Sequence, residues 1–178
     1  MSIAIRSASM GVCSRRGGIW IGYYDQAFGI SDLSGIVRFS VSGEILSRSA
    51  DLVVDCYALN VGRDATWSCW YSGFPLVRLD DNCSGQQWTN ALALGVSAVA
   101  VSPPYALLVG CYDDCNRLTL AEMVRDGLKL VHVFDAKSVL GVDLAEAWFT
   151  ARNDCLFVVG GGRAYTVPVS HFVGAEFR

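Results

Sequence analysis

Hydrophobic and polar positions form a repeated pattern of two short apolar runs joined by a tight turn. The clearest case is residues 67–79, which read W-S-C-W-Y-S-G-F-P-L-V-R-L, with Ser72-Gly73 between the runs and Pro75 at the start of the second. Runs rich in aromatic and β-branched residues on either side of such turn formers are typical of a strand, a turn and a second strand. This stretch therefore predicts a β-hairpin.

The same pattern occurs at three other places in the chain. W-I-G-Y-Y-D, at 20–25, leads after a longer loop to S-G-I-V-R-F, and L-L-V-G-C-Y-D-D, at 107–114, leads to N-R-L-T-L. A weaker version, C-L-F-V-V-G-G-G at 155–162, is followed by A-Y-T-V-P-V. Further short runs complete each unit, so the chain is predicted to be all-β, with four short strands in each of four units.

The units recur at a regular interval. Alignment of Tyr24, Tyr71 and Tyr112 gives intervals of 47 and 41 residues, and the fourth unit follows near Gly160. The second strand of each unit is apolar on both of its alternating faces, as strands are when neighbouring sheets cover both sides. A repeat of about 40 to 50 residues built from four short strands is the sequence signature of a propeller blade.

The repeats resemble the β-propellers of the WD40, kelch and NHL-like types over nearly the whole chain. They lack the Gly-His and Trp-Asp pairs of WD40 repeats, and they lack the kelch double glycine followed by spaced Tyr and Trp. The runs G-Y-Y-D and S-G-I-V-R-F also resemble uncharacterised bacterial propeller proteins. The resemblance implies a single propeller-like domain, residues 1–178, with about four antiparallel four-stranded blades. It leaves open a half-propeller or a small closed propeller.

Composition places the chain among well-buried globular proteins. Of its 178 residues, 52% are hydrophobic and only 17% are charged, which excludes a disordered chain. The formal net charge of -3 comes without a basic patch, so we predict no nucleic-acid partner. The high apolar content, and the lack of an obvious outer strand after the fourth unit, predict self-association as a homodimer, because open strand edges and apolar faces are normally covered.

The seven cysteines indicate a reducing compartment. An odd number cannot pair fully within one chain, and several lie in apolar runs, where a free cysteine behaves as a small hydrophobic residue. The first residues hold no sustained apolar stretch of the kind found in signal peptides. We therefore predict a cytoplasmic location.

One uncharged stretch is long enough to cross a membrane as a helix. Residues 91–111 carry no charge over 21 residues. Ser102-Pro103-Pro104 interrupts this stretch, and two adjacent prolines prevent a continuous helix while suiting a turn between strands. We therefore predict two strands here and no membrane partner.

The loops after the second strand of each unit form the predicted binding site. In propellers these loops open on the face that commonly binds ligands, and here they carry Tyr and Asp, with arginines on the strands that follow. Such a ring favours a sugar or a small polar ligand, held by stacking and hydrogen bonds. The alternative, which turn chemistry favours, is that Tyr caps the core while Asp holds a turn or pairs with Arg. The candidate ligand-binding residues are Tyr24, Asp25, Arg38, Tyr71, Arg78, Tyr112, Asp113 and Asp114.

No catalytic residue, metal site or cofactor is predicted. Cys111 and Cys115 lack the second cysteine pair that a zinc site normally needs, and His132 and His171 are far away in sequence. His132 fits a partly exposed strand position. The glycine triplet at 160–162 is followed by a strand rather than a helix, so it predicts a hairpin turn and not a phosphate-binding loop.

These observations favour a non-enzymatic binding or interaction module of propeller type, with a protein or a small polar ligand as its partner. The first alternative is a carbohydrate-active hydrolase or lyase that uses carboxylates on the blade loops, such as Asp25 and Asp113. The second alternative is a remnant that has kept its fold and lost its function.

Overall fold

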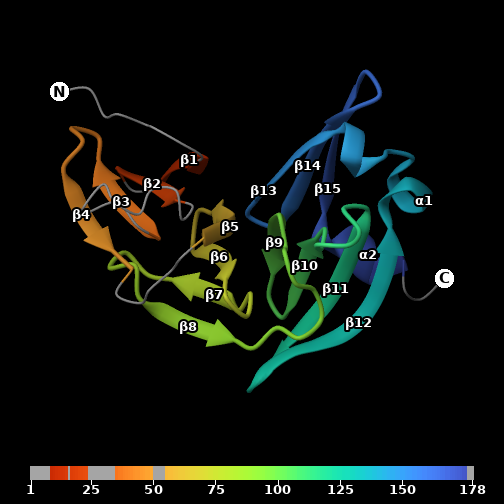
Figure 1. Cartoon of the computed structure of the whole chain (residues 1–178), viewed down its shortest axis with the longest axis horizontal. Coiled ribbons are helices and arrows are strands. Elements are labelled where there is room, and N and C mark those ends of the chain that lie inside the picture. Colours follow the sequence, from red (N-terminus) through yellow and green to blue (C-terminus); the bar gives the residue numbers. More distant parts are fainter. Residues whose placement is uncertain (1–8, 16, 24–34, 50–54, 176–178) are drawn as a thin grey trace.

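The computed structural model describes residues 9–15, 17–23, 35–49 and 55–175, which form four antiparallel sheets in series (Figure 1). The first sheet contains β1 (Ser9–Arg15), β2 (Gly18–Tyr23), β3 (Ile36–Ser40) and β4 (Ile45–Arg48). The second contains β5 (Asp55–Val61), β6 (Thr66–Tyr71), β7 (Leu76–Leu79) and β8 (Gly85–Trp88). The third contains β9 (Ala98–Ser102), β10 (Tyr105–Val109), β11 (Arg117–Val124) and β12 (Gly127–Asp135). The fourth contains β13 (Trp148–Arg152), β14 (Cys155–Gly160) and β15 (Arg163–Pro168).

The turns between strands follow from the turn-forming residues in the sequence. Gly161 and Gly162, with φ of 56° and 74°, form the two-residue turn between β14 and β15, a backbone path that glycine adopts without strain. Pro103-Pro104 lies between β9 and β10, so the uncharged stretch contains two strands as predicted. In the described part of the chain, no helix is long and apolar enough to cross a membrane.

Successive sheets pack face to face, and their first strands lie innermost. β1 contacts β5, β5 contacts β9, and β9 contacts β13. Figure 1 shows the sheets following one another in an arc from the left of the view to its upper right. Alternate residues of a strand point to opposite faces, so each middle sheet contributes to two hydrophobic clusters. Buried pairs from the three interfaces are Ile36 and Val77, Leu76 and Leu108, and Leu107 and Leu156.

A buried asparagine ties three of the sheets together. The Asn60 side-chain amide on β5 donates to Val99 O of β9 at 2.8 Å and to Asn153 O, in the β13–β14 turn, at 2.7 Å. Its Oδ1 accepts the Asn153 N–H at 2.8 Å. Asn60 therefore forms hydrogen bonds with backbone groups outside the strand pairing, and these bonds fix the second, third and fourth sheets relative to one another.

A second buried asparagine and an ion pair hold the link between the third and fourth sheets. Asn116 donates to Asp143 Oδ1 at 2.9 Å and accepts the Leu144 N–H at 2.7 Å. Lys137 Nζ lies 2.7 Å from Asp143 Oδ2. The hydrogen bonds from Lys137, Asn116 and the Ala145 N–H lower the pKa of Asp143 to about 2, so this carboxylate stays ionised at physiological pH.

The structure differs from the sequence prediction in three elements. The fourth sheet has three strands rather than the four expected of each unit, and the sequence there lacks an obvious outer strand. The chain turns after β15 into helix α2 (Val169–Ala175), and Phe172 of α2 is buried between the third and fourth sheets. β1 is a strand that the sequence pattern did not predict. The connection at 136–144 contains helix α1 (Ala136–Leu140), and a 3-10 turn, η2 (Leu144–Glu146), ends the link to β13.

The cysteines with described side chains are free thiols. Cys56, Cys69 and Cys83 are buried, and burial raises the pKa of Cys56 to about 11. These three behave as small core residues. For Cys56 and Cys69 this agrees with their place in apolar runs, whereas Cys83 lies in the polar turn D-D-N-C-S between β7 and β8. The cytoplasmic location inferred from the cysteines stays a prediction.

Candidate functional site

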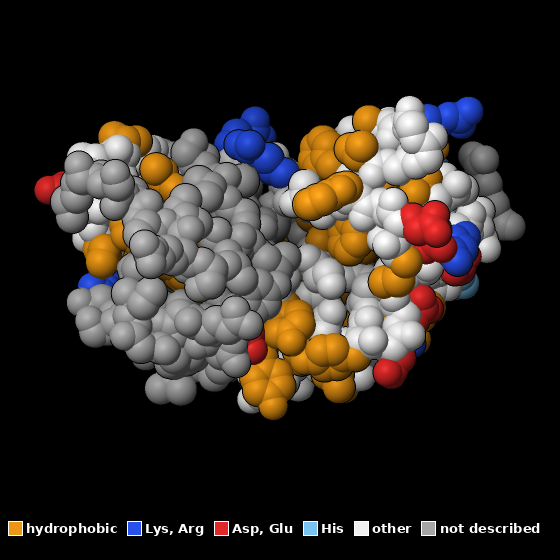
Figure 2. Space-filling view, turned by 45° about the horizontal axis from the view of Figure 1, so that its top comes forward, with side chains coloured by type: hydrophobic (Ala, Val, Ile, Leu, Met, Phe, Trp, Pro, Cys, Tyr) orange, Lys and Arg blue, Asp and Glu red, His pale blue; other side chains and the backbone are white. Residues whose placement is uncertain are grey.

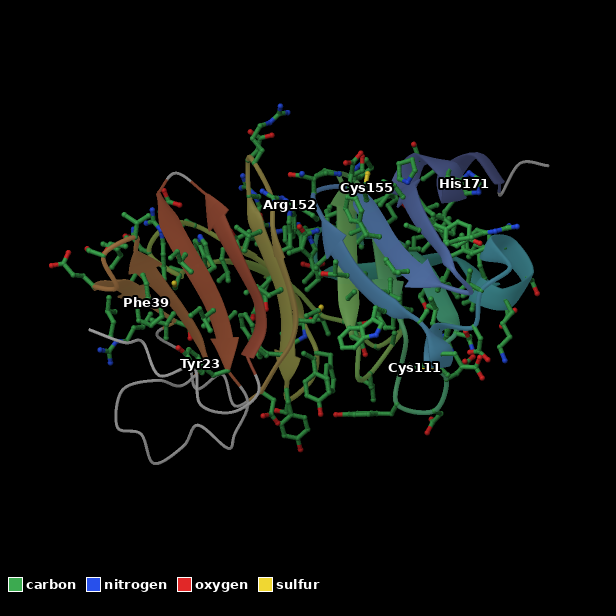
Figure 3. The ribbon with its side chains drawn as sticks, turned by 90° about the horizontal axis from the view of Figure 1, so that it is seen from above. Tyr23, Phe39, Cys111, Arg152, Cys155 and His171 are labelled. Atoms are coloured by element: carbon green, nitrogen blue, oxygen red, sulfur yellow. The ribbon has the colours of Figure 1, made fainter. Side chains whose placement is uncertain are left out.

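The two ends of the sheets carry different segments. Figure 3 marks one end with Tyr23 and Cys111, and the opposite end with Arg152 and Cys155. The first end carries the connections after β6 and β10 and the links from β8 to β9 and from β12 to β13, and it is called the connector end below. The second end carries the β5–β6, β9–β10 and β13–β14 turns, and it is called the hairpin end.

Four aromatic rings converge at the connector end of the second and third sheets. This aromatic cluster consists of Tyr57, Tyr71, Phe74 and Tyr112. Ring centroids lie 5.0 Å apart for Tyr57 and Phe74, 5.4 Å for Phe74 and Tyr112, and 6.1 Å for Tyr71 and Phe74, all edge to face. Phe74 is only 2% exposed, whereas Tyr71 and Tyr112 are 45% and 57% exposed. The cluster is therefore a buried phenylalanine that supports two exposed tyrosines.

A buried asparagine holds Phe74 in place. The Asn90 side-chain amide donates to Phe74 O at 2.9 Å and to Ala93 O at 2.7 Å. Its Oδ1 accepts the N–H groups of Leu92 and Ala93. These bonds fix the β6–β7 turn against the link between β8 and β9, so the position of the Phe74 ring does not depend on the turn alone.

Tyr112 is held on the same link. Its N–H donates to Leu94 O at 2.9 Å, and its ring lies against Gly95, where an added Cβ would come within 2.7 Å of the Tyr112 Cδ1 atom. Gly95 also has a φ of 78°, so this position combines close approach with a backbone path that favours glycine. The Tyr112 hydroxyl donates to the Tyr57 hydroxyl at 3.3 Å.

The environment raises the pKa of Tyr112. Its pKa is raised to about 12, and desolvation is the largest cause. The hydrogen bond with Tyr57 and the nearby charges of Tyr57, Tyr71 and Asp55 raise the pKa further toward that value. Because the residue is 57% exposed, only the part of the ring that packs against Phe74 and Tyr57 is withdrawn from water. At physiological pH Tyr112 therefore offers a neutral hydroxyl group beside its exposed aromatic surface.

The raised pKa gives a direct test of the cluster geometry. Tyr57→Phe removes the hydroxyl that accepts from Tyr112, so we expect the pKa of Tyr112 to fall from about 12 toward its ordinary value of 10. The sign follows from linkage: Tyr112 contributes its stabilisation fully below pH 10 and loses it as pH rises through 12. Carbon-13 NMR titration of labelled tyrosine measures this value, with Tyr112→Phe to assign the signal. An unchanged Tyr112 titration in Tyr57→Phe would contradict the proposed contact.

The structure brings only some of the predicted site residues together. Tyr71 and Tyr112 join in the aromatic cluster, whereas Tyr24 and Asp25 lie outside the described residues. Asp113 is exposed beside the cluster tyrosine. Asp114 serves its own turn, because its Oδ1 accepts the Asn116 N–H at 2.9 Å.

The two predicted arginines lie away from the cluster. Arg38 lies between the first and second sheets, where its Nη1 donates to Asp81 O at 3.0 Å and its guanidinium lies 5.9 Å from the centroid of the Trp20 ring. Arg78, on β7, is exposed toward the hairpin end and pairs across the sheet with Trp67. Arg38 thus joins two sheets, and Arg78 borders a different surface.

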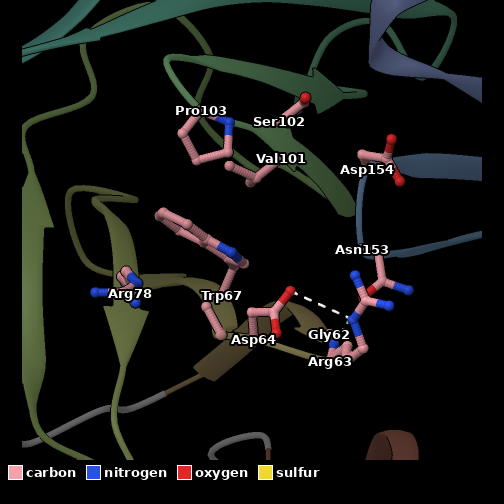
Figure 4. Close-up of a pocket in the computed structure, with 11 residues that line it drawn as sticks. Gly62, Arg63, Asp64, Trp67, Arg78, Val101, Ser102, Pro103, Asn153 and Asp154 are labelled. Atoms are coloured by element: carbon pink, nitrogen blue, oxygen red, sulfur yellow. Dashed lines mark hydrogen bonds and ion pairs between the residues drawn. The ribbon is translucent and has the colours of Figure 1, made fainter.

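That surface is a recess of about 460 Å³ at the hairpin end (Figure 4). It lies between turns of the second, third and fourth sheets, and Trp67, Arg78 and Pro103 form part of its wall. Arg63 and Asp64 beside it form an exposed ion pair of 3.4 Å, and the Arg63 N–H donates to Asn153 Oδ1. Within the described residues, no group of three or more His, Cys, Asp or Glu side chains is placed to hold a metal ion.

The fold and the site define an all-β protein of four successive antiparallel sheets with an exposed aromatic cluster at one end. The chain matches the YxzG family over residues 27–167, and it belongs to that family. No curated protein matches the chain by sequence.

Two solved structures share the fold at low sequence identity. PorZ, an essential bacterial surface component of the type-IX secretion system of Porphyromonas gingivalis, gives a TM-score of 0.54 at 12% identity, over 92% of this chain and 20% of PorZ. The computationally designed Ika8 protein gives a TM-score of 0.51 at 13% identity, over 92% of this chain and 46% of Ika8. The chain thus spans less than half the length of either protein, and the likeness concerns the fold alone.

Proposed function

We propose that the chain is a non-enzymatic binding module of β-propeller type, in which the four sheets act as blades and the aromatic cluster contacts a protein partner. The blade interpretation is supported by the serial order of the sheets, by the contacts between their first strands, and by the interval of the sequence repeat. The binding role is carried by one observation: Tyr71 and Tyr112 are exposed while the Phe74 ring beneath them is buried.

The chemistry of the cluster favours a protein partner over a sugar. The rings meet edge to face and so do not form one coplanar platform, and Leu94, whose carbonyl binds Tyr112, adds exposed aliphatic surface beside them. Tyrosine offers a large, rigid contact area with a polar tip, and it is enriched at protein interfaces for that reason. We therefore expect the partner to present an apolar or aromatic anchor.

The hydrolase or lyase alternative receives no specific support from the described carboxylates. Asp114 is engaged in its turn, Asp113 is exposed to solvent, and Asp25 lies outside the described residues. An acid and base pair for glycoside hydrolysis needs two carboxyl groups that face one substrate, with one pKa raised. The binding module is accordingly the function that we propose.

A phage-displayed peptide library tests this function. We expect peptides selected on the wild-type chain to carry an aromatic or leucine anchor, and their affinity to fall at least about tenfold in Tyr71→Ala/Tyr112→Ala, as truncated interface tyrosines usually cause. Leu46→Ala, on β4, is the matched control, because Leu46 is similarly exposed on another sheet. Failure to enrich any peptide, or binding that the double variant leaves unchanged, counts against a peptide site here. An oligosaccharide array, probed in parallel, tests the sugar alternative.

A further inference from the structure

The fourth sheet has one buried face and one exposed face. Leu156, Val158 and Val167 point into the cluster shared with the third sheet. On the other face, Trp148 is 85% exposed and Val159, its cross-strand neighbour, is 56% exposed. Figure 2 shows hydrophobic side chains gathered at the upper right of the view, where Figure 1 places the fourth sheet. The outer face of the fourth sheet is defined by its exposed alternate residues, Trp148, Thr150, Arg152, Phe157, Val159, Ala164 and Thr166.

The same face of an earlier sheet is an interface. In the second sheet, the face that points toward the next sheet carries Ala58, Trp67, Leu76 and Trp88, and all four are buried against the third sheet. The outer face of the fourth sheet likewise carries aromatic and aliphatic residues, together with Arg152 and two threonines, and the described chain has no fifth sheet to cover it. Exposed apolar surface of this kind marks an interaction site.

We propose that the outer face of the fourth sheet packs against the same face of a second copy of this chain, as a two-fold symmetric homodimer. The partner that complements a flat, alternating sheet face is another such face, as the three sheet interfaces within the chain show. A two-fold interface uses one patch on both copies, so no second free surface is needed. The central positions Thr150 and Phe157 carry no charge, so two copies meet there without repulsion.

At the opposite end of the sheet series, the described side chains at the centre of the outward face are buried. In the first sheet, the face turned away from the second sheet contains Ile21, Val37 and Phe39, and these side chains are buried. Two half-propellers could also close into one ring, with the first sheet of each copy against the fourth sheet of the other. Such closure needs this face of the first sheet to be exposed. The burial therefore favours pairing of the fourth sheets with each other.

The arrangement of charge selects one orientation of the two sheets. Arg152 lies at the hairpin end of β13, and Trp148 lies at the other end of the same strand. A two-fold axis that lies between the two sheets and perpendicular to the strands separates the two Arg152 side chains by about 13 Å along the strand, since four rises of about 3.3 Å join position 148 to position 152. The same axis places Arg152 near Trp148 of the partner subunit, a pair that attracts through the face of the indole ring.

Light scattering on the reduced full chain tests the proposal. Measurements at chain concentrations up to about 100 μM detect dimers with micromolar dissociation constants. We expect a mass twice the 19.2 kDa of one chain. Trp148→Lys/Val159→Lys places two charges on the outer face, and we expect it to weaken the dimer at least about 100-fold, as the loss of a large aromatic interface anchor does. Val41→Lys, also an exposed valine, is the matched control and should leave the dimer intact.

Two further variants distinguish face-to-face pairing from misfolding and from pairing through the edge of β15. Thr150→Glu charges the centre of the face without removing a large side chain, so it serves if the lysine double variant fails to fold; we expect it to give monomers. Thr166→Pro removes an N–H that points to the open edge of β15, since Tyr165 pairs with Val158 in the hydrogen-bonded register. A wild-type monomer, or a dimer broken by Thr166→Pro and unaffected by Thr150→Glu, would overturn the proposal.

Discussion

Replacement of Asn60 by alanine is expected to lower the free energy of unfolding by about 3 kcal/mol, from the buried groups it leaves without a partner. Asn60 is fully buried, and its side chain joins β5 to Val99 of β9 and to Asn153 in the β13–β14 turn. Without it, Val99 O and the Asn153 N–H lose their side-chain partner. The carbonyl of Asn153 still accepts from the Val101 N–H at 3.0 Å, so that group is spared.

Urea unfolding followed by circular dichroism measures this loss. For a chain of this size, about 3 kcal/mol corresponds to a fall in melting temperature of roughly 6 to 12 °C. Asn82→Ala provides the control, because Asn82 is an exposed asparagine in the β7–β8 turn and its replacement should cost less than about 0.5 kcal/mol. Equal losses for the two variants would show that Asn60 does not hold the sheets together.

The sheets could be predicted from the sequence because their signals are local. Alternation of apolar residues, turn glycines and the Pro103-Pro104 pair each act within a few positions, and the structure has strands and turns at those places. β1 was not predicted from the sequence because its run of small residues, S-M-G-V-C-S-R, has little β-branched or aromatic content. α2 was not predicted either, because it is short and gains its stability from burial of Phe172 rather than from helix propensity.

The candidate site could be predicted only in part, for a related reason. The repeat aligns Tyr71 with Tyr112, and the structure has Tyr71 as the last residue of β6 and Tyr112 in the loop after β10. The sequence therefore indicates that they lie at the same end of neighbouring sheets. Tyr57 lies on a first strand and Phe74 inside a turn, and no spacing relates them to the tyrosines. Their contacts depend on how one sheet lies against the next, which is set by long-range packing and by asparagines such as Asn90.

Asparagine is hard to interpret from sequence because its usual role is in turns. Asn60, Asn90 and Asn116 are all buried, and each binds backbone or side-chain groups of a segment that is separate in the fold. Asn60 and Asn153 are 93 residues apart in the chain. Only the assembled sheets bring such groups within hydrogen-bonding distance, so the residue type alone carries no signal of the partnership.

Replacement of Phe74 by alanine is expected to cost about 3 to 4 kcal/mol of stability, the usual range for removing a buried phenylalanine ring. Phe74 contacts all three tyrosines of the aromatic cluster, and its ring is 2% exposed. Its loss opens a cavity beneath Tyr57 and Tyr112 and removes the edge-to-face contacts that orient them. Urea unfolding measures the stability, and near-ultraviolet circular dichroism reports the tyrosine packing.

Phe74→Leu separates packing from ring orientation, because leucine fills much of the volume without an aromatic edge. We expect it to cost about 1 to 1.5 kcal/mol, as near-isosteric core exchanges do, and to weaken the peptide binding proposed for the cluster while the sheets stay folded. The Asn90 amide would still bind the carbonyl at position 74, since that contact uses the backbone. If Phe74→Leu retained full peptide affinity, the exposed tyrosines would not need their edge-to-face support, and binding would depend on Tyr71 and Tyr112 alone.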